Sequence, residues 1–579
     1  MTDTQSTRAG KHFARAVQTT DASAPCASAD EAVSAASAPS QKEVAVEDRA
    51  EKSSNMVSVL VIISRITGFL RTSAQAWAIG VTMLASCYTI AAQMPNVMYE
   101  LVMGGMLVTS FLPVYIKVRE KAGREGASAY ASNLLSFVLL LMVGLTVLSF
   151  IFAGPIIWTQ SAGATESFDF GLTVWLFRWF ACEIILYALS SIFSGVLNAE
   201  RDYLWSNAAP ILNNIITISS FILYGVVTKA GWLSQTQAVI ILAIGNPLGV
   251  AAQVFCQLPA LRRHGVKIRP KIDFHDPALK DTLSIGLPTL VVTFAAFPTN
   301  AVMSSCALSI TEAGAAISYY ARVWYVLPFS VFAIPISVTM FTELSNYFVK
   351  GEMKSFVSSF SHGASKIMFT LIPFTMYFAV FATPLIAVIA SGAFTGDAVS
   401  LTAGYLAVLA LTLPFYGLSS YLQKACSALL RMKFYAFATV IAAVIQIVIC
   451  LVFTPIFGLY VVPASSMVYY LVIDAVTMIR LRRQLGPLGL RSVLVSMLRS
   501  LALGAAGALV GWLIVSGLTL ALGPCDSIVK GLLYAAAGGL PALAVTFGTA
   551  TILGISDSPF FDAIFSRLIP KRLQRGRAA

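Results

Sequence analysis

Fourteen apolar runs, each of about 20 residues or more, dominate the 579-residue chain between residues 55 and 554. A helix of about 20 residues spans the roughly 30 Å hydrocarbon core of a bilayer. Only 11% of the residues are charged and the mean hydropathy is +0.78, whereas soluble domains carry about 25% charged residues. We therefore predict an all-α polytopic membrane protein with about 14 transmembrane helices. The predicted spans are 55–79, 83–115, 128–153, 170–198, 204–228, 235–258, 281–308, 314–347, 361–390, 398–423, 434–455, 459–479, 492–520 and 529–554.

Basic residues collect in alternate loops between these runs. If the N-terminus is inside, the inner loops hold twenty Lys and Arg residues, and the outer loops hold only Lys229 and Lys530. Cytoplasmic loops are enriched in Lys and Arg. We therefore predict that both termini and the loop from Arg262 to Lys280 are cytoplasmic. This topology accounts for the net charge of +12 without a nucleic-acid partner.

Residues 1–52 differ from the rest of the chain because they contain few large apolar side chains. Such a segment cannot bury enough apolar surface to order itself, so we expect a disordered cytoplasmic tail. A cleavable signal peptide needs an apolar region of about 7–15 residues near its start, and the first apolar run begins only near Met56. That run is expected to remain as an anchor.

The first twelve spans divide into two halves that resemble each other. Tyr187-Ala-Leu-Ser-Ser191 recurs as Tyr416-Gly-Leu-Ser-Ser420, 229 positions later, and each is followed by a basic turn. Duplicated helical halves that rock about a central site are typical of transporters. We predict two six-helix lobes plus two extra C-terminal helices. The predicted segments are the tail 1–52, the N-lobe 53–260, a basic linker 261–280, the C-lobe 281–485, helices 13 and 14 in 486–556, and a basic cytoplasmic tail 557–579.

Several charged residues lie inside the predicted spans. A charge near the bilayer centre costs roughly 2.5–3.5 kcal/mol, so Arg65 and Arg71 of the first span are expected to face a wet cavity. Other charged residues in the spans include Glu100, Arg178, Glu183, Arg322 and Asp474. Arginine binds phosphate oxygens through a planar, permanently charged fork, so the surplus of arginine favours an anionic, phosphate-bearing amphiphile.

Structural roles are the alternative for three of these residues. Arg178 and Glu183 are five positions apart and could pair through neighbours, and Asp474 could snorkel or cap a helix. Asp474 is also a candidate for ion coupling, because hard cations prefer oxygen ligands. Membrane potential acting on a charged cavity is the other driving force we consider.

Prolines and glycines interrupt the spans that carry these charges. We interpret Gly68, Pro95, Gly104, Gly105 and Pro328 as hinge residues, because such residues loosen or kink helices.

Nothing in the sequence indicates a metal site, a cofactor or an enzyme. The eight cysteines occur singly, no histidine has helical spacing to another His or Cys, and no GxxxxGK[ST] phosphate loop is present. These absences argue against a zinc site and against ATP hydrolysis through such a loop.

The residues in the first two spans resemble a known family. The run Ser64-Arg65-Ile-Thr-Gly68-Phe-Leu-Arg71, followed by Pro95-Asn96 and Phe111-Leu-Pro113, is similar to the N-terminal signature of the MurJ (MviN) family of lipid II flippases. That family belongs to a wider superfamily of polysaccharide exporters and multidrug extruders. The similarity covers most of residues 53–485.

The resemblance implies a protein of the bacterial cell membrane that moves an undecaprenyl-pyrophosphate-linked peptidoglycan precursor to the outer leaflet without ATP hydrolysis. Membrane lipids and cell-wall synthesis proteins are the implied partners. Arg65 and Arg71 match two arginines of the family's central cavity, and Asn96, Glu100 and Arg322 complete the expected substrate-binding set. The chain departs from the family pattern at Ser86, Tyr99 and Val323.

Three other classes of function remain as alternatives: transporters of other substrates, an enzyme and a scaffold. A related exporter of another lipid-linked oligosaccharide, or an ion-coupled multidrug extruder, would share the fold, but an extruder of cationic drugs favours an acidic cavity. A membrane glycosyltransferase would place catalytic carboxylates in a sizeable external loop, and the longest outer loop offers only Glu166 and Asp169. A scaffold derived from a flippase is the third.

Overall fold

Helices are the only regular elements in the part of the chain that the structure describes. The computed structural model describes residues 41–104, 112–265, 272–273, 275–277, 294, 297–394 and 396–569, and within them the all-α fold is confirmed. The helices are α2 Gln41–Ile79, α3 Met83–Tyr99, α4 Leu112–Ile151, α5 Ala153–Ser161, α6 Phe170–Phe180, α7 Glu183–Ala199, α8 Tyr203–Lys229, α9 Gln235–Phe255, α10 Leu258–Arg263, a helix at 297–310, α12 Gly314–Pro328, α13 Ile334–Lys350, α14 Met353–Ile389, α15 Gly396–Ala410, α16 Leu413–Ala428, α17 Met432–Phe457, α18 Val461–Leu485, α19 Leu490–Leu522, α20 Ile528–Leu543, α21 Thr549–Leu553 and α22 Pro559–Leu568. Three π-helical segments, η1 Glu100–Gly104, η3 Phe329–Ala333 and η4 Ala544–Gly548, continue α3, α12 and α20.

Many of these helices are built to cross a membrane. Ten described spans are long and apolar enough, and α15 with α16, bent by 46°, would make an eleventh. On α17 the side chains of Val440, Val444 and Val448 are all about half exposed. Because residues four apart share one helix face, they form an apolar stripe suited to lipid. The count of fourteen is consistent with this structure but stays a prediction.

The start of the chain differs from the sequence expectation in one respect. The helix α2 begins at Gln41, inside the segment 1–52 that was expected to be a tail. Residues 1–40 lie outside the described residues, so their expected disorder is not tested. Met1–Met56 and Val57–Ala579 form two separate units, and the remaining description concerns the second.

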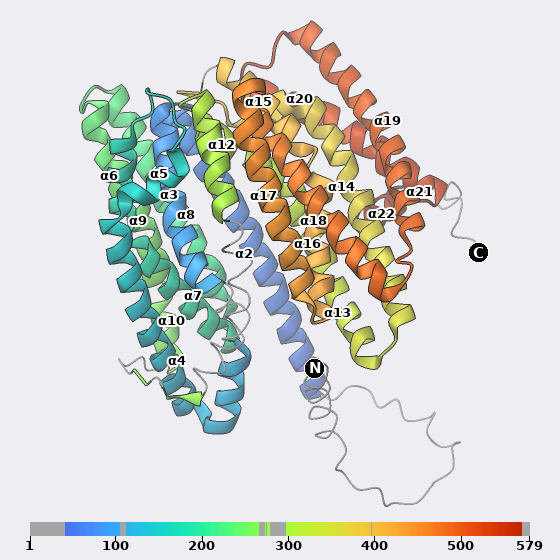
Figure 1. Ribbon diagram of the computed structural model, residues 1–579, viewed down its shortest axis with the longest axis horizontal. Coiled ribbons are helices and arrows are strands. Elements are labelled where there is room, and N and C mark those ends of the chain that lie inside the picture. Colours follow the sequence, from blue (N-terminus) through green and yellow to red (C-terminus); the bar gives the residue numbers. More distant parts are fainter. Residues whose placement is uncertain are drawn as a thin grey trace, which may run out of the picture. The chain divides into compact units, whose positions relative to one another are not determined.

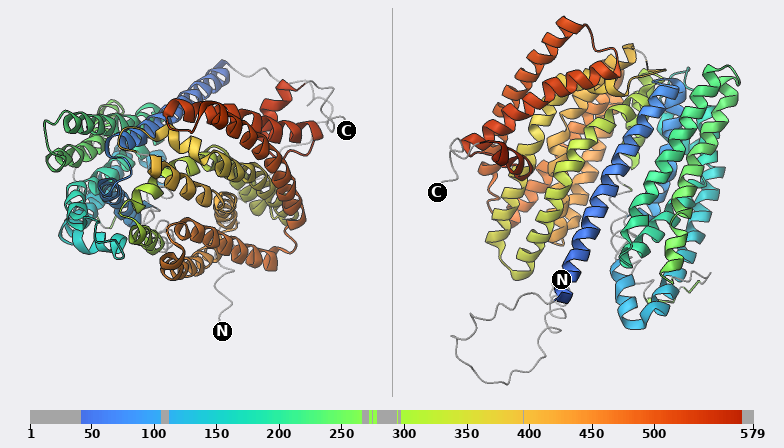
Figure 2. Two further views of the ribbon diagram at one scale, coloured as in Figure 1. Left: turned by 90° about the horizontal axis from the view of Figure 1, so that it is seen from above. Right: turned by 180° about the vertical axis from the view of Figure 1, so that it is seen from behind.

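Two helical bundles make up most of the second unit (Figure 1). In the first bundle α4 packs on α7 and α8 on α9, and in the second α17 packs on α18 and α14 on α15. The helices α19 and α20 pack on α14, as the views in Figure 2 also show. Tyr377 and Phe381 of α14 form a small core there with Ala508 and Ala542.

The backbone repeats with the same offset as the sequence motif. Arg201 and Leu430 have positive φ angles of 61° and 57°, and no other non-glycine residue in the described part does. Each lies in the turn before a long helix, α8 or α17. The two turns, the starts of those two helices, and the segments η1 and η3 are all 229 positions apart. The internal repeat is therefore a property of the backbone.

The two bundles contact each other through helix ends and loops on the side that the expected topology places outside. The Tyr320 hydroxyl donates to the Gly80 carbonyl at 3.0 Å, and the Ala316 amide donates to Ser86 Oγ at 3.2 Å. We call this set of bonds the lobe contact. Its other members are Gly163 N to Ser305 Oγ at 2.8 Å, Thr165 N to Leu308 O at 3.1 Å and Ala393 N to Trp77 O at 3.2 Å.

Candidate functional site

Two adjoining cavities lie where the bundles meet. One, of about 280 Å³, is lined by Arg71 of α2 and is called the Arg71 cavity. The other, of about 270 Å³, is lined by Arg322 of α12 and is called the Arg322 cavity. Their shared wall consists of Thr89, Gln93, Val97 and Tyr319. Each cavity therefore contains one arginine, and a ligand larger than either could occupy both.

Phenol groups surround Arg71. Its guanidinium is hydrogen-bonded with the hydroxyl of Tyr319, and Tyr319, Tyr88 and Tyr187 all line the Arg71 cavity. The Tyr319 hydroxyl is also 3.4 Å from Thr72 Oγ1. Neutral hydroxyls leave the charge of the guanidinium available for an anion, which an acidic neighbour in direct contact would neutralise.

Asn96 lines the same cavity. Its Nδ2 donates to Oε1 of Glu100 at 2.9 Å, one helical turn further along. Glu100 itself is exposed and begins η1. The structure thus brings Asn96 to the cavity wall and places Glu100 beside it, outside the lining.

Glu183 lies one layer behind the Arg71 cavity. Its side chain is 0% exposed, and it accepts hydrogen bonds from Asn246 Nδ2 at 2.9 Å and from the Tyr187 hydroxyl at 3.4 Å. Arg178, considered as an indirect partner of Glu183, is exposed, and its guanidinium lies over the Phe150 ring, 5.6 Å from the ring centroid. The two residues are five positions apart, on either side of the turn between α6 and α7. Their side chains therefore point in different directions.

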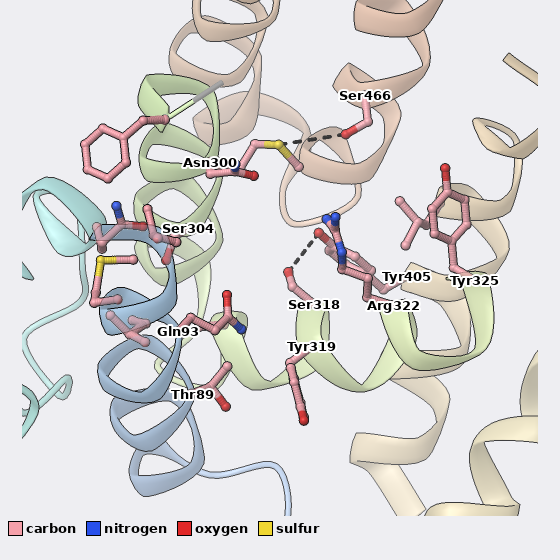
Figure 3. Close-up of a pocket in the computed structure, with 18 of the residues that line it drawn as sticks. Thr89, Gln93, Asn300, Ser304, Ser318, Tyr319, Arg322, Tyr325, Tyr405 and Ser466 are labelled. Carbon is pink, nitrogen blue, oxygen red and sulfur yellow. Dashed lines mark hydrogen bonds between the residues drawn. The ribbon is translucent and has the colours of Figure 1, made fainter. Parts of the chain in front are cut away.

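Arg322 lies near Ser318, Tyr325 and Tyr405 in the Arg322 cavity (Figure 3). Tyr470 also lines this cavity. Ser318 donates to the Tyr405 hydroxyl at 2.8 Å, and Thr412 donates to the Tyr325 hydroxyl at 2.7 Å. Neutral donors and acceptors also line this cavity at Gln160, Asn300 and Ser304. Such a lining suits a polar, hydroxyl-rich ligand with an anionic group.

Two predicted residues lie away from both cavities. Arg65 is exposed and, being six residues from Arg71, sits about 9 Å further along α2. Asp474 of α18 is 6% exposed, and neither of its carboxylate oxygens has a hydrogen-bond partner among the described residues. Of the predicted set, then, Arg71, Asn96 and Arg322 line the adjoining cavities, and Arg65, Glu100 and Asp474 do not.

The expected hinge residues fall at distinctive places in the helices. Pro95 lies inside α3, five residues before η1, and Gly104 ends η1. Pro328 directly precedes η3. Gly68 lies within α2, where an added Cβ would be 3.7 Å from Asn214 Nδ2. Gly105 lies outside the described residues.

The sequence analysis missed most of the polar lining. Gln75 and Gln93 line the cavities with Asn246 and Tyr319, and all four lie inside apolar runs. The uncharged amide side chains of Gln75, Gln93 and Asn246 could have been recognised from the sequence, because burying a polar group without a hydrogen-bond partner in a membrane span is costly.

Ser86 and Tyr99, two positions at which the chain departs from the family pattern, contact other parts of the protein. Ser86 is 0% exposed and serves the lobe contact through its bond with the Ala316 amide. Tyr99 is buried with its ring 6.3 Å from the Tyr187 ring. Neither side chain lines either cavity.

Comparisons with known proteins place this geometry in context. A family model described as "Lipid II flippase MurJ" matches residues 75–531. Proteins named probable lipid II flippase MurJ from Rhizobium tropici and Borreliella burgdorferi are 25% and 23% identical to this chain. The two alignments cover 62% and 68% of this chain and 67% and 76% of those proteins.

Solved structures show the same fold. A lipid II flippase MurJ in an inward closed conformation has a TM-score of 0.67 and 21% identity, over 85% of this chain and 98% of that chain. An inward-facing multidrug transporter of the MATE family has a TM-score of 0.60 and 16% identity, over 74% of this chain and 98% of that chain.

Proposed function

The chain belongs to the lipid II flippase MurJ family, and from this membership we propose that it moves lipid II from the inner to the outer leaflet of the bacterial cell membrane. The observation that carries the proposal is the pair of adjoining arginine cavities between the two bundles. Lipid II combines a pyrophosphate, a polar sugar–peptide head and a long apolar tail, so its carrier needs three different environments.

The Arg71 cavity provides the environment for the pyrophosphate. The Arg71 fork and the Asn96 amide supply donors to phosphate oxygens, and hydrogen bonds to charged groups are the strong ones. Arg65 lies nearer the N-terminus of α2 than Arg71 does. It would attract the head group before the head group reaches Arg71. The Tyr319 hydroxyl, which lines both cavities, adds one more donor.

The Arg322 cavity provides the environment for the rest of the head group. Its tyrosine, serine and amide groups suit sugar hydroxyls, and Arg322 suits a carboxylate. An apolar cavity of about 280 Å³ between α12, η3, α14 and α20 is lined by aromatic and aliphatic side chains such as Trp324 and Phe374. It supports a lipid-linked substrate.

We place the transport step in the relative motion of the two bundles. The lobe contact closes the expected outer side, so substrate enters from the inner side in this state, and opening of the contact releases it. The π-helical segments that follow Pro95 and Pro328 are the hinges. Asp474, with its unpartnered carboxyl group, is our candidate for ion coupling.

The proposal is tested by replacing Arg71. We expect Arg71→Ala to lose nearly all lipid II translocation, because the variant removes the guanidinium that donates to phosphate oxygens; its membrane abundance is measured in parallel. Arg71→Lys keeps the charge without the bidentate fork, so we expect intermediate activity. Translocation is measured as accessibility of lipid II at the outer leaflet after depletion of the native protein.

Arg178→Ala is the matched control, because this arginine is exposed and stacks on Phe150 outside both cavities. It should leave translocation unchanged. Stable Arg71→Ala protein with full translocation would contradict the proposal. Translocation of a different lipid-linked oligosaccharide in the same assay would favour the related exporter, and loss of abundance would favour a structural role for Arg71.

A further inference from the structure

Glu183 is a buried acid beside the Arg71 cavity, for which we propose an anionic ligand. Its presence there calls for a physical explanation. Glu183 is the first residue of α7 and is fully buried within a membrane span. Its two carboxylate oxygens accept from different donors, Asn246 at Oε1 and Tyr187 at Oε2. Both donors line the Arg71 cavity, so one side chain separates the carboxylate from the ligand space.

Full burial opposes a charge on Glu183, and three features of its surroundings offset that cost. A carboxylate is an acceptor only, and both oxygens here receive donors. The N-terminus of α7 carries partial positive charge, which favours an anion. Arg71 is close enough to interact electrostatically with Glu183, although no ion pair joins them directly. Cys182 and Tyr88 are the other titratable groups that interact with it.

The fold itself does not require an acid at this place. The internal repeat relates Glu183 to Thr412, 229 positions later, at the corresponding break between α15 and α16. Thr412 is neutral and donates to the Tyr325 hydroxyl beside Arg322. Tyr187 and its repeat partner Tyr416 are identical. The same helix break therefore forms with a threonine, and the acid is particular to the Arg71 side.

We propose that Glu183 is a positioning residue whose buried carboxylate balances the charge of Arg71 and thereby limits how tightly the cavity holds a lipid pyrophosphate. This inference rests on the proposed function. A transport site must bind well enough to load and weakly enough to release. Glu183 holds Tyr187 and Asn246 against the cavity and keeps Arg71 from acting as an uncompensated cation.

Glu183→Gln tests this assignment because it keeps the size and a carbonyl acceptor while removing the charge. In nanodiscs, we expect the variant to bind undecaprenyl pyrophosphate about tenfold more tightly, or about 1.4 kcal/mol. Lipid II turnover should fall while half-saturation shifts to lower substrate. Glu343→Gln is the control: Glu343 is exposed on α13, accepts from Ser359 and lines neither cavity, so binding should not change.

A second variant addresses the case in which Glu183→Gln accumulates poorly. Tyr187→Phe removes only the hydroxyl that donates to Glu183, so the same tightening is expected on a smaller scale. Weaker binding by this variant would mean that Tyr187 acts on the ligand directly, and would overturn the assignment. Unchanged binding by Glu183→Gln would overturn it as well.

Infrared difference spectra of wild type and Glu183→Gln separate this inference from the proposed function. Loss of carboxylate bands in the variant supports an ionised Glu183, and loss of a protonated carboxyl band overturns the inference, whatever the substrate is. A wild-type protein that fails to bind undecaprenyl pyrophosphate would contradict the proposed function, and the infrared result would still decide the state of Glu183.

Discussion

Tyr319 and Tyr320 are neighbours in the sequence but have different surroundings in the structure. Tyr319 lines both arginine cavities and interacts with Arg71. Tyr320 is 0% exposed and donates to the Gly80 carbonyl in the lobe contact. Successive helical side chains point about 100° apart, so one faces the ligand space and the other faces the protein.

We expect Tyr319→Phe to reduce lipid II translocation several-fold without changing thermal stability, since only a cavity hydroxyl is lost. Tyr320→Phe should lower stability by about 1–3 kcal/mol, because it leaves a buried carbonyl without its donor. Thermal unfolding in detergent and translocation, measured on both variants, check the pair. Equal effects of the two substitutions on translocation would remove Tyr319 from the proposed site.

At this scale the sequence predicted types of residue better than their directions. The cost of a charge in lipid was enough to single out Arg71 and Arg322, and both line cavities. The same argument could not separate Arg71 from Arg65, because the difference lies in which face of α2 meets the other bundle. It also missed Tyr319, since a tyrosine in a span carries no such penalty.

At the scale of elements, glycine allows α19 to approach its neighbours closely. A Cβ on Gly507 would lie 2.1 Å from Thr546 Oγ1 and 2.6 Å from the Ala542 carbonyl. Thr546 is itself bonded to the Tyr377 hydroxyl and to the Leu503 carbonyl. Small residues permit such contacts between membrane helices, and here they fasten α19 and η4 to α14.

We expect Gly507→Ala to destabilise the protein by about 1–3 kcal/mol. The new methyl group must displace the hydrogen-bonded side chain of Thr546 and the backbone carbonyl of Ala542. Gly517→Ala, on the same helix with nothing within 4 Å of the added Cβ, is the control. It should be neutral or slightly stabilising, since alanine has the higher helix propensity. Thermal unfolding in detergent distinguishes them, and identical melting temperatures would show that α19 packs loosely.

The apolar runs predicted where helices exist more accurately than where they break. One span was expected at 170–198, and the structure has one at Phe170–Ala199, in which two turn residues separate α6 from α7. One was expected at 398–423, and α15 and α16 bend by 46°. Hydropathy remains high through both breaks because the lipid environment is the same on either side, so it contains no signal for a change of direction. The short helices α5 and α22 were missed for lack of length.

At the scale of the whole transporting unit, the lobe contact depends on two glycines in the expected outer loops. Gly80 and Gly392 have φ angles of +59° and +64°, a region that side chains rarely adopt. A Cβ on Gly80 would lie 2.3 Å from the Ala393 carbonyl, and one on Gly392 would lie 2.3 Å from the Trp77 carbonyl. At these two glycines, backbone atoms from the two bundles therefore lie in direct contact.

The repeat explains why this arrangement was only partly foreseeable. An offset of 229 in Tyr187 and Tyr416 predicted two similar bundles, and the paired turns at Arg201 and Leu430 bear this out. A repeat, however, describes each bundle alone. The contact between the bundles joins residues far apart in the sequence, such as Gly80 and Tyr320, so no local pattern predicts it.

Gly392→Ala should shift the protein toward an outward-open state, because the added methyl group meets the Trp77 carbonyl and strains a left-handed backbone. A cysteine introduced as Gln93→Cys, in the wall shared by the two cavities, reports this state. With Gly392→Ala present, a membrane-impermeant thiol reagent added outside intact cells should label that cysteine several-fold faster. Gly396→Ala, with open space around its added Cβ, should not increase labelling. Faster labelling from the cytoplasmic side instead would place these loops inside and reverse the expected topology, and equal labelling of all three proteins would show that the outer side opens without separating Gly392 from Trp77.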